Sequence, residues 1–83
     1  MWPEWWEWQI SFTRHAELRM EQRGVSEVEL RAMLQRATGY RPSVTAERFM
    51  IETTHRGQPW VVVVEPDPEQ QILVVVTAYE VGA

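Results

Sequence analysis

Two valine-rich runs in the C-terminal half of the chain restrict its fold more than any other feature. The runs from Trp60 to Glu65 and from Ile72 to Tyr79 are apolar at nearly every position, which is typical of buried strands. Both are far shorter than the ~20 apolar residues that a membrane-spanning helix needs. Residues 66–69 between them are Pro-Asp-Pro-Glu, a sequence that predicts a connecting loop.

A third strand is predicted just before these two. The segment from Arg48 to Thr54 alternates, with Phe49 and Ile51 on one side, and residues 55–58 are expected to turn the chain, with His55 as a solvated loop residue. Three consecutive strands joined by short turns favour an antiparallel meander. Residues 60–65 show no polar alternation, so we expect this strand to be covered on both faces.

The N-terminal half predicts one strand and two helices. Residues Trp6 to Phe12 alternate between apolar and polar, so we expect a strand with one buried face. Thr13 is a suitable N-cap for the helix that follows, and Gly24 is expected to end it. The second helix is expected to begin at a capping box formed by Ser26 and Glu29 and to end at Gly39. It should bury an apolar stripe, which consists of Leu30, Met33, Leu34 and Ala37. Residues 40–42 are expected to bend at a proline.

Together these elements predict an α+β domain in the order β-α-α-β-β-β. In this two-layer arrangement a helical hairpin packs on one face of a mainly antiparallel sheet. The length of 83 residues indicates a single domain, residues 1–83, with a Trp-rich N-terminal segment at residues 1–8.

Composition excludes several classes of protein. A net charge of −4 argues against non-specific binding of nucleic acid over the whole surface. The absence of Cys excludes disulfides and thiolate chemistry. Two distant histidines do not make a set of metal ligands, so we expect no metal and no cofactor. No signal peptide or membrane segment is evident in the sequence, and we expect a cytoplasmic protein that does not bind a membrane.

The first predicted helix carries an unusual row of cationic side chains. His15, Arg19 and Arg23 recur at i, i+4 and i+8, so they share one face of the helix. The row falls beside the expected buried stripe, and we expect it to point toward the rest of the protein or into a groove. Buried cations need a partner. That partner is either an internal carboxylate, such as that of Glu52 or Glu80, or an external anion.

Several segments of the chain together resemble a known family. They are the motif His15-Ala-x-x-Arg19-Met-x-x-Arg23-Gly and residues 48–49, 55–60, 64–67 and 73–79. This pattern resembles a small bacterial family of domains of unknown function that is allied to the RelE/ParE/BrnT toxin superfamily. The resemblance implies a RelE-like fold. It also implies a toxin component of a type II toxin–antitoxin pair, with a cognate antitoxin and RNA or the ribosome as partners.

RelE-like toxins cleave mRNA on the ribosome with basic and Tyr side chains on the exposed face of the sheet. By this resemblance His15, Arg19 and Tyr79 are catalytic, and Arg23 and Arg48 bind phosphate, as in a metal-independent endoribonuclease. The structural alternative stays open. In that case His15 forms a hydrogen bond between helix and sheet, the arginines pair with internal carboxylates, and Tyr79 belongs to the core.

The tryptophans support a hypothesis from a different class. Trp2 and Trp5 add more large aromatic surface than the first strand of a small core can bury, and exposed aromatic patches mark contact surfaces. The alternative function is therefore a non-catalytic protein of the same fold that binds a partner, or a second copy as a homodimer, through Trp2 and Trp5. These residues could instead fold back onto the sheet edge. A ParE-like inhibitor of a protein target is a third hypothesis.

Overall fold

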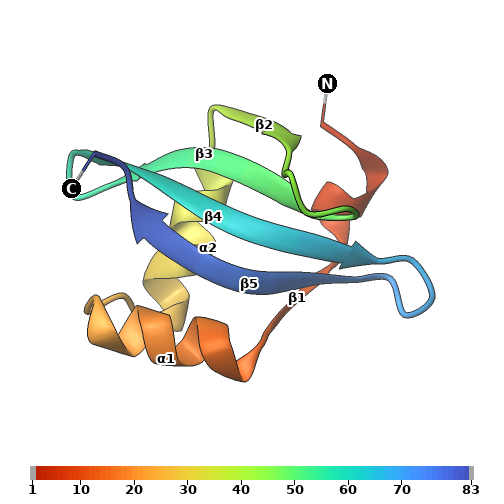
Figure 1. Ribbon diagram of the computed structural model, residues 1–83, viewed down its shortest axis with the longest axis horizontal. Coiled ribbons are helices and arrows are strands. Elements are labelled where there is room, and N and C mark those ends of the chain that lie inside the picture. The colour runs from red at the N-terminus through yellow and green to blue at the C-terminus, as the bar shows by residue number, and fades with distance from the viewer. Residues whose placement is uncertain (1, 83) are drawn as a thin grey trace.

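The computed structural model describes residues 2–82 and contains a five-stranded sheet with two α-helices (Figure 1). The elements follow in the order η1 (Glu4–Glu7, a 3₁₀ helix), β1 (Gln9–Phe12), α1 (Arg14–Gln22), α2 (Glu27–Gln35), β2 (Gly39–Pro42), β3 (Phe49–His55), β4 (Gln58–Asp67) and β5 (Ile72–Glu80). The fold class is α+β, as the sequence predicts. Within the described residues, no helix combines the length and the apolar character needed to cross a membrane.

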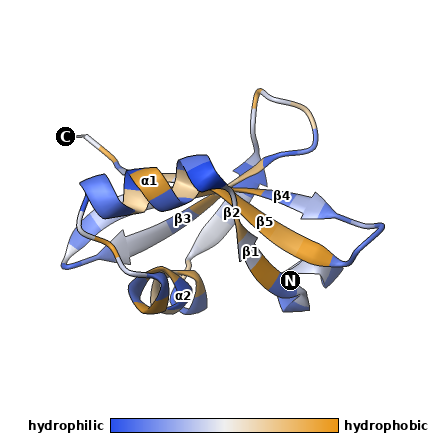
Figure 2. Cartoon of the chain, turned by 90° about the horizontal axis from the view of Figure 1, so that it is seen from below, coloured by the Kyte–Doolittle hydropathy of each residue, from blue (hydrophilic) through white to orange (hydrophobic). Residues whose placement is uncertain are grey.

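The sheet is mixed, with the strand order β1-β5-β4-β3-β2. The predicted antiparallel meander is confirmed by β3, β4 and β5, whereas β1 pairs in parallel with the first half of β5. α1 continues from β1 and packs along β5, and α2 covers one face of the sheet near β3 (Figure 1). Figure 2 shows α1 from the side and α2 nearly end-on, so the two helices are not antiparallel and the expected helical hairpin is not formed.

The chain from Trp6 to Phe12 is not a single strand, which corrects the prediction. The 3₁₀ helix η1 occupies its start, and β1 begins only at Gln9. In a strand, neighbouring side chains point to opposite faces. The tighter turn of η1 instead lets the adjacent Trp5 and Trp6 both pack against the core.

Two further boundaries differ from the sequence-based expectation. The second helix ends at Gln35 and not at Gly39, and residues 39–42 form the strand β2 in place of a bend. β2 is an edge strand. Pro42 has no N–H group to donate, and an edge strand tolerates this loss because only one of its sides is paired.

The predicted helix starts are confirmed. The hydroxyl of Thr13 accepts a hydrogen bond from the Ala16 N–H at 3.0 Å, and Gly24, at φ +68°, follows the end of α1. The capping box of α2 is complete. The Ser26 hydroxyl accepts from the Glu29 N–H at 3.1 Å, and the Glu29 carboxylate accepts from the Ser26 N–H at 2.9 Å.

The core lies between α2 and the sheet. Its largest fully buried side chains are Leu30, Met33, Ile51, Val62, Val64, Leu73 and Val75. Among the described residues the other face of the sheet carries no helix (Figure 1), yet β4 is buried on both faces as expected, since every residue from Trp60 to Val64 is buried. Val61 and Val63 on that open face are still only 4% and 9% exposed. Larger side chains in register with them on β3 and β5 shield them, such as Met50 and Tyr79.

The Glu29 carboxylate should make the stability of α2 depend on pH in the acid range. Hydrogen bonding from the Ser26 backbone N–H lowers the pKa of Glu29 below 4.5; the Ser26 hydroxyl and Arg56 act in the same direction, against an opposing desolvation effect. A lowered folded pKa gives stability that is present above pH 4.5 and is lost as the pH falls through the folded pKa. We expect Glu29→Gln to lower the Tm by a few degrees at neutral pH.

The variant should also lose less of its Tm than the wild type as the pH falls below 4.5. Circular-dichroism melts across the acid range measure both effects. Glu69→Gln serves as the control, because the side chain of Glu69 accepts no hydrogen bond among the described residues. If Glu29→Gln and the wild type lose Tm in parallel, the capping carboxylate is not the titrating group.

Candidate functional site

The start of α1 is fixed to the last strand. The Thr13 N–H donates to the Val75 carbonyl at 3.1 Å, and the Thr13 hydroxyl donates to the Val76 carbonyl at 3.3 Å. From there α1 runs in the same direction as β5 (Figure 1) and buries Ala16 and Met20. α1 therefore lies along the margin of the sheet where β1 no longer pairs with β5.

The cationic row (His15, Arg19 and Arg23) is exposed, which corrects the expectation that it points inward. All three side chains reach solvent, and only Ala16 and Met20 of this helix are buried. A helix that packs mainly against one strand buries a narrow stripe. Residues one step around the helix from that stripe stay in water, so the cations avoid the cost of desolvation.

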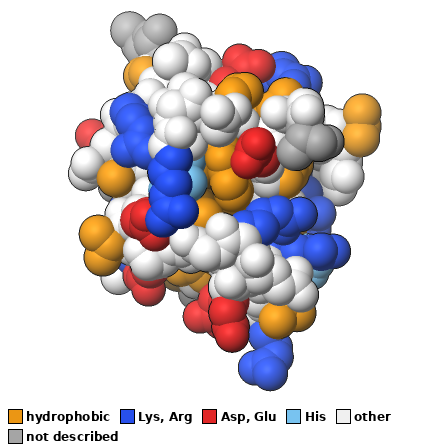
Figure 3. Space-filling model, turned by 90° about the vertical axis from the view of Figure 1, so that its left-hand side faces the viewer, with side chains coloured by type: hydrophobic (Ala, Val, Ile, Leu, Met, Phe, Trp, Pro, Cys, Tyr) orange, Lys and Arg blue, Asp and Glu red, His pale blue; other side chains and the backbone are white. Residues whose placement is uncertain are grey.

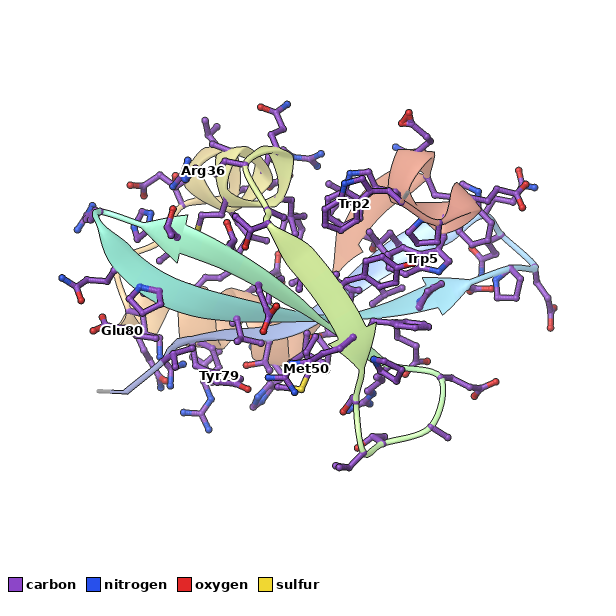
Figure 4. All side chains as sticks on the ribbon, turned by 90° about the horizontal axis from the view of Figure 1, so that it is seen from above. Trp2, Trp5, Arg36, Met50, Tyr79 and Glu80 are labelled. Carbon is purple, nitrogen blue, oxygen red and sulfur yellow. The ribbon has the colours of Figure 1, made fainter. Side chains whose placement is uncertain are left out.

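The cationic row faces the side of the sheet that α2 leaves uncovered. Glu17 and Glu21, on the opposite flank of α1, line a hollow together with Glu27 at the start of α2. The cationic row therefore lies on the flank turned away from α2. Tyr79 and Met50 point to the same uncovered side, as Figure 4 shows. Where α1 lies along β5, the cationic side chains of α1 are thus on the same side of the molecule as the open face of the sheet.

The arginines beyond α1 and its C-cap residue Arg23 all have a specific partner. Four form ion pairs and one binds a carbonyl: Arg31 with Glu27 (2.8 Å), Arg41 with Glu52 (3.3 Å), Arg48 with Glu65 (2.9 Å), Arg56 with Glu29 (3.2 Å) and Arg36 with the Thr54 carbonyl (2.9 Å). Within residues 2–82, Arg14, Arg19 and Arg23 form no ion pair. Arg19 reaches only the side-chain carbonyl of Gln22, at 3.5 Å.

Internal neutralisation of the cationic row is therefore not found in the part of the chain that the structure describes. Glu52 is engaged by Arg41 across the sheet, and Glu80 forms no ion pair with any described residue. Figure 3 shows arginine side chains gathered in separate groups at the end of the molecule that carries the C-terminus. An unpaired guanidinium keeps its planar set of donors for a carboxylate or phosphate.

The fold brings Tyr79 to the margin of α1 but sets Arg48 apart. Tyr79 lies on β5 opposite Val61 of β4, half-buried on the open face. Arg48 pairs with Glu65, which is in register with Val74 of β5. Tyr79 lies five positions after Val74, about 16 Å along a strand. Arg48 is therefore neutralised by Glu65 and lies well away from Tyr79 along the sheet.

Trp2 and Trp5 belong to an aromatic cluster (Trp2, Trp5, Trp6, Tyr40 and Phe49) at the edge of the sheet. The ring of Trp5 lies 5.0 Å from Phe49 and 5.8 Å from Tyr40, and Trp2 stacks at 4.4 Å on Trp6. Figure 4 shows both residues at the same end of the sheet. The two tryptophans thus fold back onto the sheet edge, one of the two outcomes that the sequence left open. Partner binding through them stays a prediction.

His55 is buried, which corrects the prediction of a solvated loop residue. It ends β3 and is only 6% exposed, because it continues the inward positions of Ile51 and Thr53. Its ring meets Trp60 edge-on at 5.5 Å. Its Nε2 atom lies 3.9 Å from the Glu29 carboxylate and has no hydrogen-bond partner among the described residues. Continuing the alternation of the strand by two residues would have placed His55 in the core.

Comparison with known proteins assigns the chain to a family. A family model described as "Domain of unknown function (DUF4258)" matches residues 12–80. The chain belongs to the DUF4258 family. No curated protein matches it, and no solved structure does. The DUF4258 span contains the cationic row, Arg48 and Tyr79, whereas Trp2 and Trp5 precede it. The margin of α1 and β5 is therefore part of the family domain.

Two polar groups were not singled out from the sequence. One joins α2 to the end of β3 and consists of Glu29, His55 and Arg56. The other surrounds the hollow between the helices and consists of Glu17, Glu21 and Glu27. Each group draws on segments that are separate in the chain, so residue spacing gives no signal for it. Among residues 2–82, no three His, Asp or Glu side chains gather as a metal site.

Proposed function

We propose that this DUF4258 chain is a RelE-like toxin component of a type II toxin–antitoxin pair and that it cleaves RNA. The active site would lie where the cationic row of α1 borders Tyr79 on β5. One observation carries the proposal: the arginines after Arg23 are held by carboxylates or a carbonyl, whereas Arg14, Arg19 and Arg23, on α1 and its C-cap, form no ion pair among the described residues. In a chain of net charge −4, unpaired cations on a single element concentrate the attraction for phosphate there.

The residues at this margin suit cleavage without a metal ion. Such a reaction needs a base that takes the proton of the 2′-hydroxyl, cations that stabilise the pentacoordinate phosphate, and an acid that protonates the leaving 5′-oxygen. His15 supplies an exposed imidazole for a proton transfer. Arg19 and Arg23 supply guanidinium groups for the phosphate. Tyr79 offers a ring on which a base can stack or a hydroxyl for the second proton. Arg48 would contribute only after release from Glu65.

Inducible expression in a bacterial host tests the proposal, with growth and RNA integrity followed together. We expect growth arrest with fragmentation of RNA, and His15→Ala should reduce the cleavage rate by at least about 100-fold. The loss arises because no other imidazole lies on α1. The matched control is Leu18→Ala, an exposed position on the same helix, which should cleave RNA like the wild type.

Circular dichroism of the purified variants checks that the fold is intact. Wild-type protein that neither arrests growth nor fragments RNA would contradict the nuclease proposal. Growth arrest with intact RNA would contradict it as well and would support a ParE-like inhibitor of a protein target instead.

A second candidate is a non-catalytic protein of the same fold that binds a partner, or a second copy, through the aromatic cluster. It is favoured by Trp2 and Tyr40, which are 36% and 37% exposed. Together with Thr38 and Gly39 they line a hollow of about 280 Å³. This candidate predicts a chain that leaves growth unaffected and elutes as a dimer in size-exclusion chromatography. A monomeric chain that fragments RNA would exclude the homodimer form of it.

A further inference from the structure

A groove follows α2 on the side of the molecule away from the cationic row. It consists of two hollows, of about 310 and 330 Å³. Both are lined by one face of α2, with Glu27 at the first end and Leu34 and Gln35 at the other. Arg31 lies between these positions on the same face. It is four residues after Glu27, three before Leu34 and four before Gln35. The two hollows therefore follow one another along this face of α2, and together we call them the groove.

The floor of this groove is apolar. Trp6, Ile10, Leu34 and Leu73 line one hollow, and Phe12, Met20 and Val25 line the other. A bridge lies between them, where the guanidinium of Arg31 sits over the ring of Phe12 at 5.9 Å and pairs with Glu27. β1 contributes to both hollows and is an edge strand of the described sheet. No neighbouring strand of the described sheet therefore pairs with its outer backbone groups.

The rim of the groove is acidic. Glu7 borders one hollow, and Glu17, Glu21 and Glu27 border the other. Among the described residues only Glu27 has a cationic partner, which is Arg31. Three carboxylates therefore face solvent around an apolar floor without compensation. A ligand that fills the hollows with apolar groups and brings cations to the rim would satisfy both features.

We propose that this groove binds a short segment of a partner protein in which two apolar side chains are flanked by Lys or Arg. From Glu27 to Gln35 the face of α2 spans about 12 Å, which two helical turns or about four extended residues of the partner would cover. An acidic segment would meet repulsion at the rim and would be drawn to the cationic row. The docking surface is separate from the nuclease site, and its existence does not depend on RNA cleavage.

Selection from a random 12-residue peptide display library on the immobilised full chain tests this proposal. We expect enriched peptides to carry at least two large apolar residues and a positive net charge. Isothermal titration calorimetry with a synthesised enriched peptide then measures the variants. Gln35→Trp, which fills one hollow, should weaken binding by at least about tenfold. Val44→Trp is the matched control, because Val44 is fully exposed in the loop between β2 and β3 and lines neither hollow.

Charge reversal supplies an independent arm. The double variant Glu17→Lys with Glu21→Lys should also weaken binding by at least about tenfold, whereas Glu69→Lys, in the β4–β5 turn, should not. No enrichment, enrichment of acidic peptides, or binding that tolerates Gln35→Trp would each overturn the proposal. Dimerisation of the free chain that Gln35→Trp abolishes would overturn it in favour of a second copy. The Gln35→Trp variant is also tested for RNA fragmentation. If it fragments RNA at the wild-type level, a failure of the docking proposal leaves the nuclease proposal unaffected.

Discussion

Reversing the charge of Arg19 and Arg23 together should lower the affinity for a single-stranded RNA oligonucleotide by at least about 100-fold. Both guanidinium groups are exposed and free of ion pairs among residues 2–82, so both are available to phosphate. Fluorescence anisotropy at several salt concentrations measures the loss. The slope of log affinity against log salt should also become shallower by about 2, one for each phosphate contact removed.

The control must change the net charge by the same amount. Arg31→Glu combined with Arg41→Glu does so at two arginines that already pair with carboxylates. Because those guanidinium groups are neutralised locally, we expect this variant to keep RNA affinity within about threefold of the wild type. An equal loss in both double variants would mean that binding follows net charge alone, and the assignment of a phosphate site to α1 would then be wrong.

Replacing Trp5 with Ala should lower the free energy of unfolding by about 3 kcal/mol. The indole packs between Phe49 and Tyr40 and against Trp6, so truncation leaves a cavity at the point where η1 meets the sheet. Urea unfolding followed by circular dichroism measures the loss. For a domain of this size such a change removes a large share of the total stability.

Trp2→Ala provides the comparison for Trp5. Its indole is 36% exposed and stacks mainly on Trp6, so its truncation should cost less than about 1.5 kcal/mol. A Trp5→Ala variant as stable as the wild type would show that the aromatic cluster adds little to the fold. If that variant also lost a partner or a dimer, the second candidate function would gain support over the nuclease.

Local patterns in the sequence were sufficient for the caps and the meander. Thr13 and Ser26 cap their helices because a cap needs only residues within one turn. β3 follows from alternation, β4 and β5 follow from continuous apolar runs, and the short turns between them indicate the meander. The parallel pairing of β1 with β5 could not be read in this way, because it joins residues 9–12 to residues 72–75. The short β2 was missed because Pro42 indicates a bend unless the strand is known to lie at an edge.

The residues of the candidate site could be predicted from the sequence, but whether their side chains are buried or exposed could not. The spacing of His15, Arg19 and Arg23 establishes that they share a face of α1. Whether that face is buried depends on what α1 packs against, and a single strand at the sheet margin buries only a narrow stripe. His55 shows the converse error. A residue next to a turn was expected in solvent, yet Trp60 and α2 cover it.

The sequence by itself determined the helix and strand periodicities, the helix caps and the row of cationic residues along one helix. Each of these depends on residues within a few positions of one another. Only the tertiary structure decided which arginines are neutralised and that the row on α1 is not. An ion pair such as Arg48 with Glu65 forms between strands whose register the whole sheet sets. The same holds for the groove along α2, since its acidic rim and apolar floor come from segments that meet only when the chain has folded.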